Sequence, residues 1–181
     1  MTVLRTERLV LRQWRDTDRD PWAALCADPE VMRLFPSTLT RAESDDFVDR
    51  HTALLDERGW GLWAVEVIGG SPFIGFTGLA VPGFPVPGHP DGCVEVGWRL
   101  AADQWGRGYA PEAARAVLDV AWDVVGLDEV VSFTSVGNTN SRRVMEKIGL
   151  GFEREFDHPR LAAGDPLRRH VLYAIRRGRA R

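Results

Sequence analysis

The sequence predicts an α/β (α+β) fold in which helices flank a mixed, mainly antiparallel sheet. Three observations lead to this prediction: apolar residues follow both strand and helix periods, a short turn at 69–72 joins two consecutive strands in the first half, and strands alternate with helices in the second half. No repeat, low-complexity segment or linker divides the 181 residues, so we expect one domain over residues 1–181.

The expected elements follow in chain order. A short strand at residues 9–14 comes first, and Asp16 or Thr17 is placed to cap a helix. Thr40 and Glu43 form a capping box at the start of a second, longer helix. The later elements are the end of that helix near residue 57, strands at 60–68 and 73–80, a proline-rich loop at 81–92, a strand at 93–100, a helix at 111–125, a strand at 129–136, a helix at 140–148, and strands at 152–156 and 171–175.

Composition and charge exclude several classes of protein. Apolar residues make up 44% of the chain, as in globular proteins, and a net charge of −3 argues against a nucleic-acid partner. Cys26 and Cys93 are too far apart for a metal motif and are expected to be core residues, which suits a reducing cytoplasm. Neither a signal-peptide pattern nor a long apolar run occurs, so we expect no membrane partner. His51 and His89 are expected at the surface.

The most informative pattern lies between residues 94 and 114. A strand ends near Leu100, and a glycine-spaced turn at 106–110 leads directly into a helix. Glycines let a backbone approach a ligand closely, and a helix N-terminus offers unpaired N–H groups and a positive dipole end. The pattern therefore predicts a phosphate cradle, with a plain tight turn as the alternative. Pro111 replaces the third glycine of a dinucleotide fingerprint, and no GxxxxGK motif occurs.

Two motifs in this order resemble the GCN5-related N-acetyltransferases (GNAT), especially the branch typified by the ribosomal-protein acetyltransferases RimJ and RimL. In the first motif, Q/R-x-x-G-x-G/A, Gly108 and Ala110 match, whereas Trp105 stands where Gln or Arg is usual. Residues 138–150 are similar to the second motif, N-x-x-S-x-x-V-x-E-K-x-G-F. Residues 6–12 also look like the first strand of this branch, so the resemblance covers nearly the whole chain.

The resemblance implies a GNAT fold whose sheet splays between its fourth and fifth strands. Acetyl-coenzyme A (acetyl-CoA) enters the opening as co-substrate, and no metal is implied. Residues 98–100 match the strand that pairs with the pantetheine arm, and residues 105–110 match the pyrophosphate loop. Asn138 and Ser141 match polar positions beside the cofactor, with a role at the helix start as the alternative. The expected cofactor-binding residues are Trp98, Arg99, Leu100, Trp105, Gly106, Arg107, Gly108, Tyr109, Ala110, Asn138 and Ser141.

Glu95 is the candidate general base. It lies in the strand just before the cofactor-binding segment, where a carboxylate is costly unless it is paired or functional. A structurally paired or solvent-facing carboxylate is the alternative. The thioester oxygen needs N–H donors as negative charge develops, and the strand backbone near Gly97 or Trp98 can supply them.

The general acid is less clearly marked. Many relatives place a tyrosine near the sulfur, but Met145 occupies that position here. Ser141, Tyr109, Tyr173 or water remain as proton donors, and we name Ser141 together with Glu95 as catalytic. Glu112 is expected to be a structural residue at a helix start.

The acceptor is expected beside the polar segment between the last two strands. Asp157 and His158 are the candidate acceptor-binding residues, with a structural role as the alternative, and the loop at 81–92 is expected to form the other wall. A protein N-terminal α-amine has a pKa of about 7.7–8.0, against about 10.4 for lysine, and is therefore deprotonated more easily by a weak base. A small amine such as an aminoglycoside or polyamine, or a non-catalytic coenzyme-A-binding sensor, are the alternatives, and a homodimer stays open.

Overall fold

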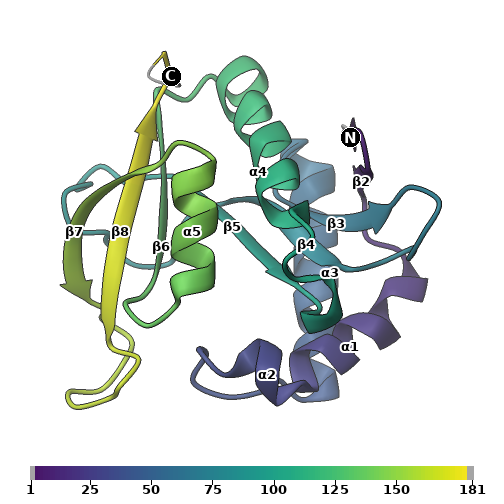
Figure 1. The fold of residues 1–181 in the computed structure, drawn as a ribbon, viewed down its shortest axis with the longest axis horizontal. Helices are drawn as coiled ribbons and strands as arrows, with labels where there is room; N and C mark the ends of the chain where they lie inside the picture. Colours follow the sequence, from purple (N-terminus) through teal and green to yellow (C-terminus); the bar gives the residue numbers. More distant parts are fainter. Residues whose placement is uncertain (1–2, 179–181) are drawn as a thin grey trace.

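The computed structural model describes residues 3–178 as an eight-stranded sheet with helices on both faces (Figure 1). The strands are β1 (Leu4–Arg5), β2 (Leu9–Arg12), β3 (Leu62–Val67), β4 (Gly75–Ala80), β5 (Glu95–Leu100), β6 (Glu129–Ser135), β7 (Gly151–Asp157) and β8 (Arg169–Arg176). The helices are α1 (Arg19–Ala27), α2 (Pro29–Met32), α3 (Arg41–Arg58), α4 (Tyr109–Val120) and α5 (Thr139–Lys147), with 3-10 turns at Asp16–Asp18 and Ala102–Gln104 and a π-helical turn at Ala121–Val125.

The sheet splays between β5 and β6. Its order is β1-β2-β3-β4-β5-β6-β8-β7, and all neighbours are antiparallel except β5 and β6. These two strands meet only where Glu95 pairs with Val131, whose N–H donates to the carbonyl of Val94 at 3.0 Å. Because the two-residue β1 shifts the numbering by one, β5 and β6 are the expected fourth and fifth strands, and the predicted splay is confirmed.

Helices cover the two faces of the sheet unequally. Figure 1 shows α4 and α5 on the near face and α3 on the far face. The apolar side of α4 is fully enclosed, and Ala113, Ala114 and Val117 are among the most buried residues of the main core. The predicted capping box begins α3: Thr40 Oγ1 accepts from the N–H of Glu43 at 3.3 Å, and Glu43 Oε2 accepts from the N–H of Thr40 at 2.7 Å.

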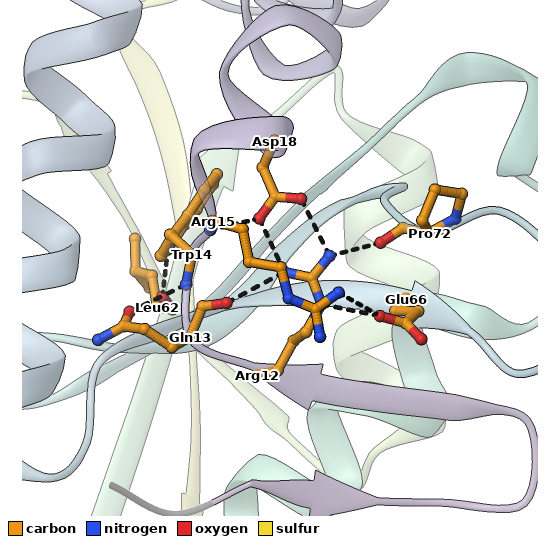
Figure 2. Close-up of polar contacts among 8 residues, drawn as sticks. All are labelled: Arg12, Gln13, Trp14, Arg15, Asp18, Leu62, Glu66 and Pro72. Carbon is orange, nitrogen blue, oxygen red and sulfur yellow. Dashed lines mark hydrogen bonds and ion pairs between the residues drawn. The ribbon is translucent and has the colours of Figure 1, made fainter.

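A buried ion-pair network joins β2 to the rest of the sheet (Figure 2). The guanidinium of Arg12 is 4% exposed and binds both carboxylate oxygens of Asp18, at 2.7 and 2.9 Å. Its Nε donates to Glu66 on β3 at 2.8 Å, and Nη2 donates to the carbonyl of Pro72 at 2.5 Å. Asp18 also accepts from the N–H of Arg15 at 2.8 Å, which closes the 3-10 turn at Asp16–Asp18. The N-cap residue of α1 is Asp18, rather than Asp16 or Thr17 as predicted.

Two histidines expected at the surface lie in packed environments. The ring of His51 stacks on Phe47 at 4.2 Å, and burial lowers the pKa of His51 to about 4. His89 is 9% exposed and lies between Glu129 and Glu153, at 3.2 and 3.6 Å. The surface prediction is wrong for both, because His51 packs on Phe47 of its own helix and the proline-rich loop brings His89 against β6 and β7.

The proline-rich loop 81–92 covers the C-terminal half of the sheet. Phe84 and Val86 pack with Val131, Phe156 and Leu172 in a second, smaller core cluster. In residues 3–178, no helix is long and apolar enough to cross a lipid bilayer. The same residues contain no group of three or more His, Cys, Asp or Glu side chains that could hold a metal ion.

Candidate active site

A cavity of about 450 Å³ opens beside the splay. Its walls come from β5, the turn after β5, the first turn of α4, the start of α5 and the segment around α2. All eleven residues expected to bind the cofactor line this cavity, although they come from two separate sequence motifs. The fold therefore brings both motifs to one place.

The glycine-spaced turn has the backbone that its sequence predicts. Gly106 and Gly108 have φ angles of 74° and 83°, in the left-handed region that favours glycine. The indole N–H of Trp105 donates to the carbonyl of Leu100 at 2.8 Å, which fixes the turn to the end of β5. Because α4 begins at Tyr109, its unpaired N–H groups and positive dipole end open onto the cavity.

Residues near the N-terminus bind the start of α4. Glu112 accepts from the N–H of Arg8 at 2.9 Å and from the hydroxyl of Thr6 at 2.6 Å. Arg8 Nη1 also donates to the carbonyl of Arg107 at 3.0 Å. These bonds give Glu112 the structural role expected for it, and they position the turn against β2.

Positive charge gathers on the cavity wall. The cationic side chains lining it are Arg33, Arg99, Arg107, Arg143 and Lys147. Glu30 is the one carboxylate among the described lining residues, and it is paired with Arg33 at 3.4 Å. In a chain with a net charge of −3, this concentration of cations around a helix N-terminus fits the phosphate groups of a nucleotide-like ligand.

Part of the β5 backbone is left without a strand partner. Hydrogen-bonding groups alternate between the two sides of a strand, and the carbonyl of Val94 bonds to β6. The backbone groups of Trp98 and Leu100 therefore point to the same side, where β6 has diverged, and the carbonyl of Leu100 accepts from Trp105. Trp98 keeps an N–H and a carbonyl directed into the opening.

Glu95 lies at the vertex of the splay, where β5 and β6 part. It is partly buried, and within residues 3–178 its carboxylate has no hydrogen-bond or ion-pair partner. Burial raises the pKa of Glu95 to about 8. Its side chain lies on the same face as Gly97, since a Cβ at Gly97 would be 3.9 Å from Glu95 Oε1.

Comparisons with known proteins agree with this geometry. The family model for the acetyltransferase (GNAT) domain matches residues 8–151. The chain belongs to the GNAT acetyltransferase family. It is 33% identical over 171 residues to FsC-acetyl coenzyme A-N(2)-transacetylase of Aspergillus fumigatus, covering 87% of this chain and 70% of that protein. It is also 31% identical over 156 residues to YkkB of Bacillus subtilis, covering 84% of this chain and 87% of YkkB.

Solved structures give the same family. A GNAT-family acetyltransferase from Bacillus anthracis superposes with a TM-score of 0.78 at 26% identity, covering 97% of this chain and 98% of that chain. An acetyltransferase from Agrobacterium tumefaciens gives a TM-score of 0.76 at 28% identity, with 97% and 94% covered. The protein is therefore an acetyl-CoA-dependent N-acetyltransferase of the GNAT family.

The second GNAT motif serves both the helix and the cavity. Asn138 is the N-cap of α5, accepting from the N–H of Ser141 at 3.2 Å, and its amide donates to Thr134 at 2.8 Å. The hydroxyl of Ser141 lines the cavity and has no partner among the described residues. Met145, in the position of the usual tyrosine, is 1% exposed and packs in the core. Tyr173 is buried and bonded to Glu146 at 3.2 Å, outside the cavity lining.

The two residues expected to bind the acceptor lie away from the cavity wall. Asp157 forms ion pairs with Arg168 at 3.4 Å and Arg169 at 3.2 Å, and the Arg169 hydrogen bond is the main cause that lowers its pKa. The ring of His158 packs edge-on against Phe84 at 4.6 Å, within an aromatic cluster. The loop at 81–92 thus touches this segment directly rather than facing it across a groove, and the acceptor role of Asp157 and His158 stays a prediction.

Two residues just after α2, Arg33 and Phe35, line the cavity, although the sequence analysis does not identify them as site residues. Arg33 and Phe35 follow a helix of four residues, which is too short to carry a periodic signal. The side chain of Arg99 contacts the ring of Phe35 at 4.1 Å, whereas the sequence assigns only the backbone of Arg99 to the cofactor. No motif signals this contact, because it joins two segments far apart in the chain.

Proposed function

We propose that the protein transfers the acetyl group of acetyl-CoA to an α-amine, with a protein N-terminus as the acceptor, by direct attack in a ternary complex. The observation that carries the proposal is the unpaired Glu95 carboxylate at the vertex of the splay, with a pKa of about 8. A base with this pKa is poised near neutral pH to take a proton from an attacking amine.

The pKa of Glu95 favours an α-amine over a lysine-like amine. An α-ammonium has a pKa of about 7.7–8.0, so transfer of its proton to Glu95 is nearly balanced in free energy. A lysine-like ammonium has a pKa of about 10.4, so the same transfer costs roughly 3 kcal/mol. A polyamine acceptor carries that larger cost.

The residues around the cavity fit acetyl-CoA, which supplies the thioester carbonyl when bound. In the proposed complex, the N–H groups of Gly108 and the first turn of α4 bind the diphosphate, with Arg107 and Arg143 beside it. The free carbonyl of Trp98 accepts from the pantetheine arm, and its free N–H donates to the developing oxyanion. The hydroxyl of Ser141 is the proposed proton donor to the leaving sulfur.

Small-molecule amines are the second candidate acceptors, because a relative at 33% identity is named as an N(2)-transacetylase of FsC. A RimL structure, titled as a ribosomal L7/L12 alpha-N-protein acetyltransferase in complex with coenzyme A, superposes with a TM-score of 0.75. At 15% identity it supports the fold alone, so assignment to the RimJ/RimL-like branch rests on the motifs. A homodimer and a cytoplasmic location stay predictions.

Competition between acceptors tests the proposal. The purified protein receives acetyl-CoA with three sets of amines: peptides with free N-termini, the same peptides blocked at the N-terminus but carrying an internal lysine, and polyamines with aminoglycosides. Thiol release measures turnover, and mass spectrometry locates the acetyl group. We expect acetylation at free N-termini. Acetylation confined to small amines contradicts the proposal, and no turnover with any amine supports a coenzyme-A sensor instead.

A further inference from the structure

Arg99 is a partly buried arginine without an acidic partner among the described residues. Its guanidinium lies 4.1 Å from the ring centre of Phe35 and 5.3 Å from that of Trp22, and its Nη1 is 3.6 Å from the sulfur of Cys26. Its Nε is buried with no hydrogen-bond partner. Burial, the largest cause, lowers the pKa of Arg99, and no carboxylate contributes to that shift.

An unpaired charge at this depth is costly. A buried arginine is normally paired with an acid or bonded through all its N–H groups, and aromatic rings offset only part of the cost. Glu30 lines the same cavity but is paired with Arg33. Arg99 lines the cavity, and its guanidinium has hydrogen-bonding capacity that the described protein groups do not use. Because Nε is itself buried, a ligand in the cavity would meet the two Nη nitrogens.

Arg99 and Glu95 lie on one face of β5 with bare backbone between them. Side chains alternate along a strand, so Glu95, Gly97 and Arg99 share a face. A Cβ built at Gly97 would have only Glu95 Oε1 within 4 Å, at 3.9 Å, so the surface between the two charged side chains is open. Four residues of extended strand separate their Cα atoms by about 13 Å, and an extended peptide covers that length with about three to four residues.

We propose that Arg99 binds a carboxylate of the acceptor while Glu95 receives its amine, so that the enzyme selects α-amines followed within a few residues by an acidic group. This inference rests on the proposed function of Glu95 and names the substrate class for that same site. The carboxylate can belong to an aspartate or glutamate near a protein N-terminus or to the C-terminus of a short peptide. Both sources present the same planar pair of oxygens, which the guanidinium binds through two N–H groups.

The experiment uses peptide pairs that differ only in charge. One pair carries Asp or Asn at the third position of a longer peptide, and another is a tripeptide with a free or an amidated C-terminus. For each pair, the ratio of kcat/KM for the anionic member to that for the neutral member is measured with the wild type, Arg99→Met and Arg99→Lys. The ratio is the readout, so a general loss of activity does not alter it.

We expect the wild type to prefer the anionic member by about 10- to 100-fold, the range for a charge-assisted hydrogen bond. Arg99→Met should bring the ratio close to one, and Arg99→Lys should keep part of the preference because it retains the charge. Arg176→Met is the matched control: Arg176 is exposed, paired with Glu129 at 2.6 Å and outside the cavity lining, so its loss should leave the ratio unchanged.

Three results overturn the inference: a wild-type ratio near one, a ratio that Arg99→Met leaves intact, or a larger effect of Arg99→Met on acetyl-CoA affinity, measured by calorimetry, than on the ratio. The last result assigns the side chain to the cofactor.

Failure of the proposed function gives a different result from failure of this inference. If the anionic tripeptide is acetylated with an Arg99-dependent preference but longer peptides are not, the anion site stands and the protein N-terminus is wrong.

Discussion

Arg12 is a buried arginine and Arg99 a partly buried one, and the protein surrounds their charges differently. Arg12 binds Asp18 through two nitrogens, Glu66 through a third, and the carbonyl of Pro72, and it joins β2, β3 and the turn before β4 (Figure 2). Arg99 has aromatic rings and a thiol around it, and it lines the cavity. A charge that is paired and hydrogen-bonded within the protein has a structural role. A charge without such partners at a cavity is available to bind a ligand.

The same distinction applies to the other groups of the site. Glu95 is a partly buried carboxylate without a protein partner, and Trp98 and the start of α4 present backbone N–H groups without strand or helix partners. Trp98, Arg99 and the start of α4 line the cavity, whereas Glu95 lies at the β5–β6 bridge, outside the cavity lining but on the same strand as Trp98 and Arg99.

The largest expected effect is a loss of unfolding free energy on substitution of Arg12, the arginine whose charge is paired within the protein. Arg12→Met strands the buried carboxylate of Asp18, and removing one member of a buried pair costs about 3–5 kcal/mol of unfolding free energy. Urea denaturation measures the loss. Arg15→Met is the matched control, because Arg15 contacts the same Glu66 at 3.2 Å but is 57% exposed, and it should cost about 1 kcal/mol or less. Equal losses for both variants contradict the architectural role.

The glycine turn tests the unsatisfied donors. Gly108→Asp places a negative charge beside the proposed diphosphate site, and we expect acetyl-CoA to bind about 100-fold more weakly by calorimetry. Gly108→Asn adds the same bulk without the charge and should lose clearly less affinity, since Asn tolerates the positive φ. Gly126→Asp, at a φ of 76° and outside the cavity lining, is the positional control. Unchanged affinity in Gly108→Asp removes the diphosphate site.

The unpaired carboxylate should also affect stability. Because burial raises the pKa of Glu95 to about 8 from its ordinary value of 4.5, the folded state holds a proton that the unfolded state releases. The stability of the wild type relative to Glu95→Gln should therefore fall as pH rises from about 5 to 9, by roughly 1–3 kcal/mol given the partial exposure. Denaturation at both pH values measures the difference, and no change between them contradicts the burial of this charge.

The smallest effect is expected for Arg99. Arg99→Met removes a charge that no described acid balances and keeps a side chain that can pack against Phe35 and Trp22. We expect the free energy of unfolding to change by about 1 kcal/mol or less, in either direction. A loss as large as that of Arg12→Met would mean that Arg99 is architectural as well, and the contrast between the two arginines would disappear.

The sequence predicts the fold and much of the cavity lining, but it does not predict the contacts around α2. Turn glycines, a helix start and the capping of α5 by Asn138 are local features, so short patterns are enough to find residues 105–110, Asn138 and Ser141, which all line the cavity. The insertion of β8 between β6 and β7, the four-residue α2 and the contact of Arg99 with Phe35 depend on segments far apart in the chain. Periodicity carries no information on such contacts.

Element ends show the same limit. The strand expected from residue 60 begins at Leu62, and the strand expected from residue 73 begins at Gly75. The helix expected at 111–125 begins earlier, at Tyr109, and changes to a π-helical turn after Val120, which its apolar spacing does not reveal. The ion pairs of Asp157 with Arg168 and Arg169 are likewise not predicted, because these partners come from the other side of a loop.

The pH dependence of Glu95→Gln tests the central claim most directly. The measurement is kcat/KM for a peptide with a free N-terminus, from pH 6 to pH 10, in the wild type, in Glu95→Gln and in the control Glu155→Gln on the exposed side of β7. We predict that the wild type gains activity up to about pH 8, and that Glu95→Gln loses about 10²- to 10⁴-fold near pH 7, with a smaller deficit where the amine is already neutral. A deficit of equal size at every pH would contradict the claim that Glu95 is the general base.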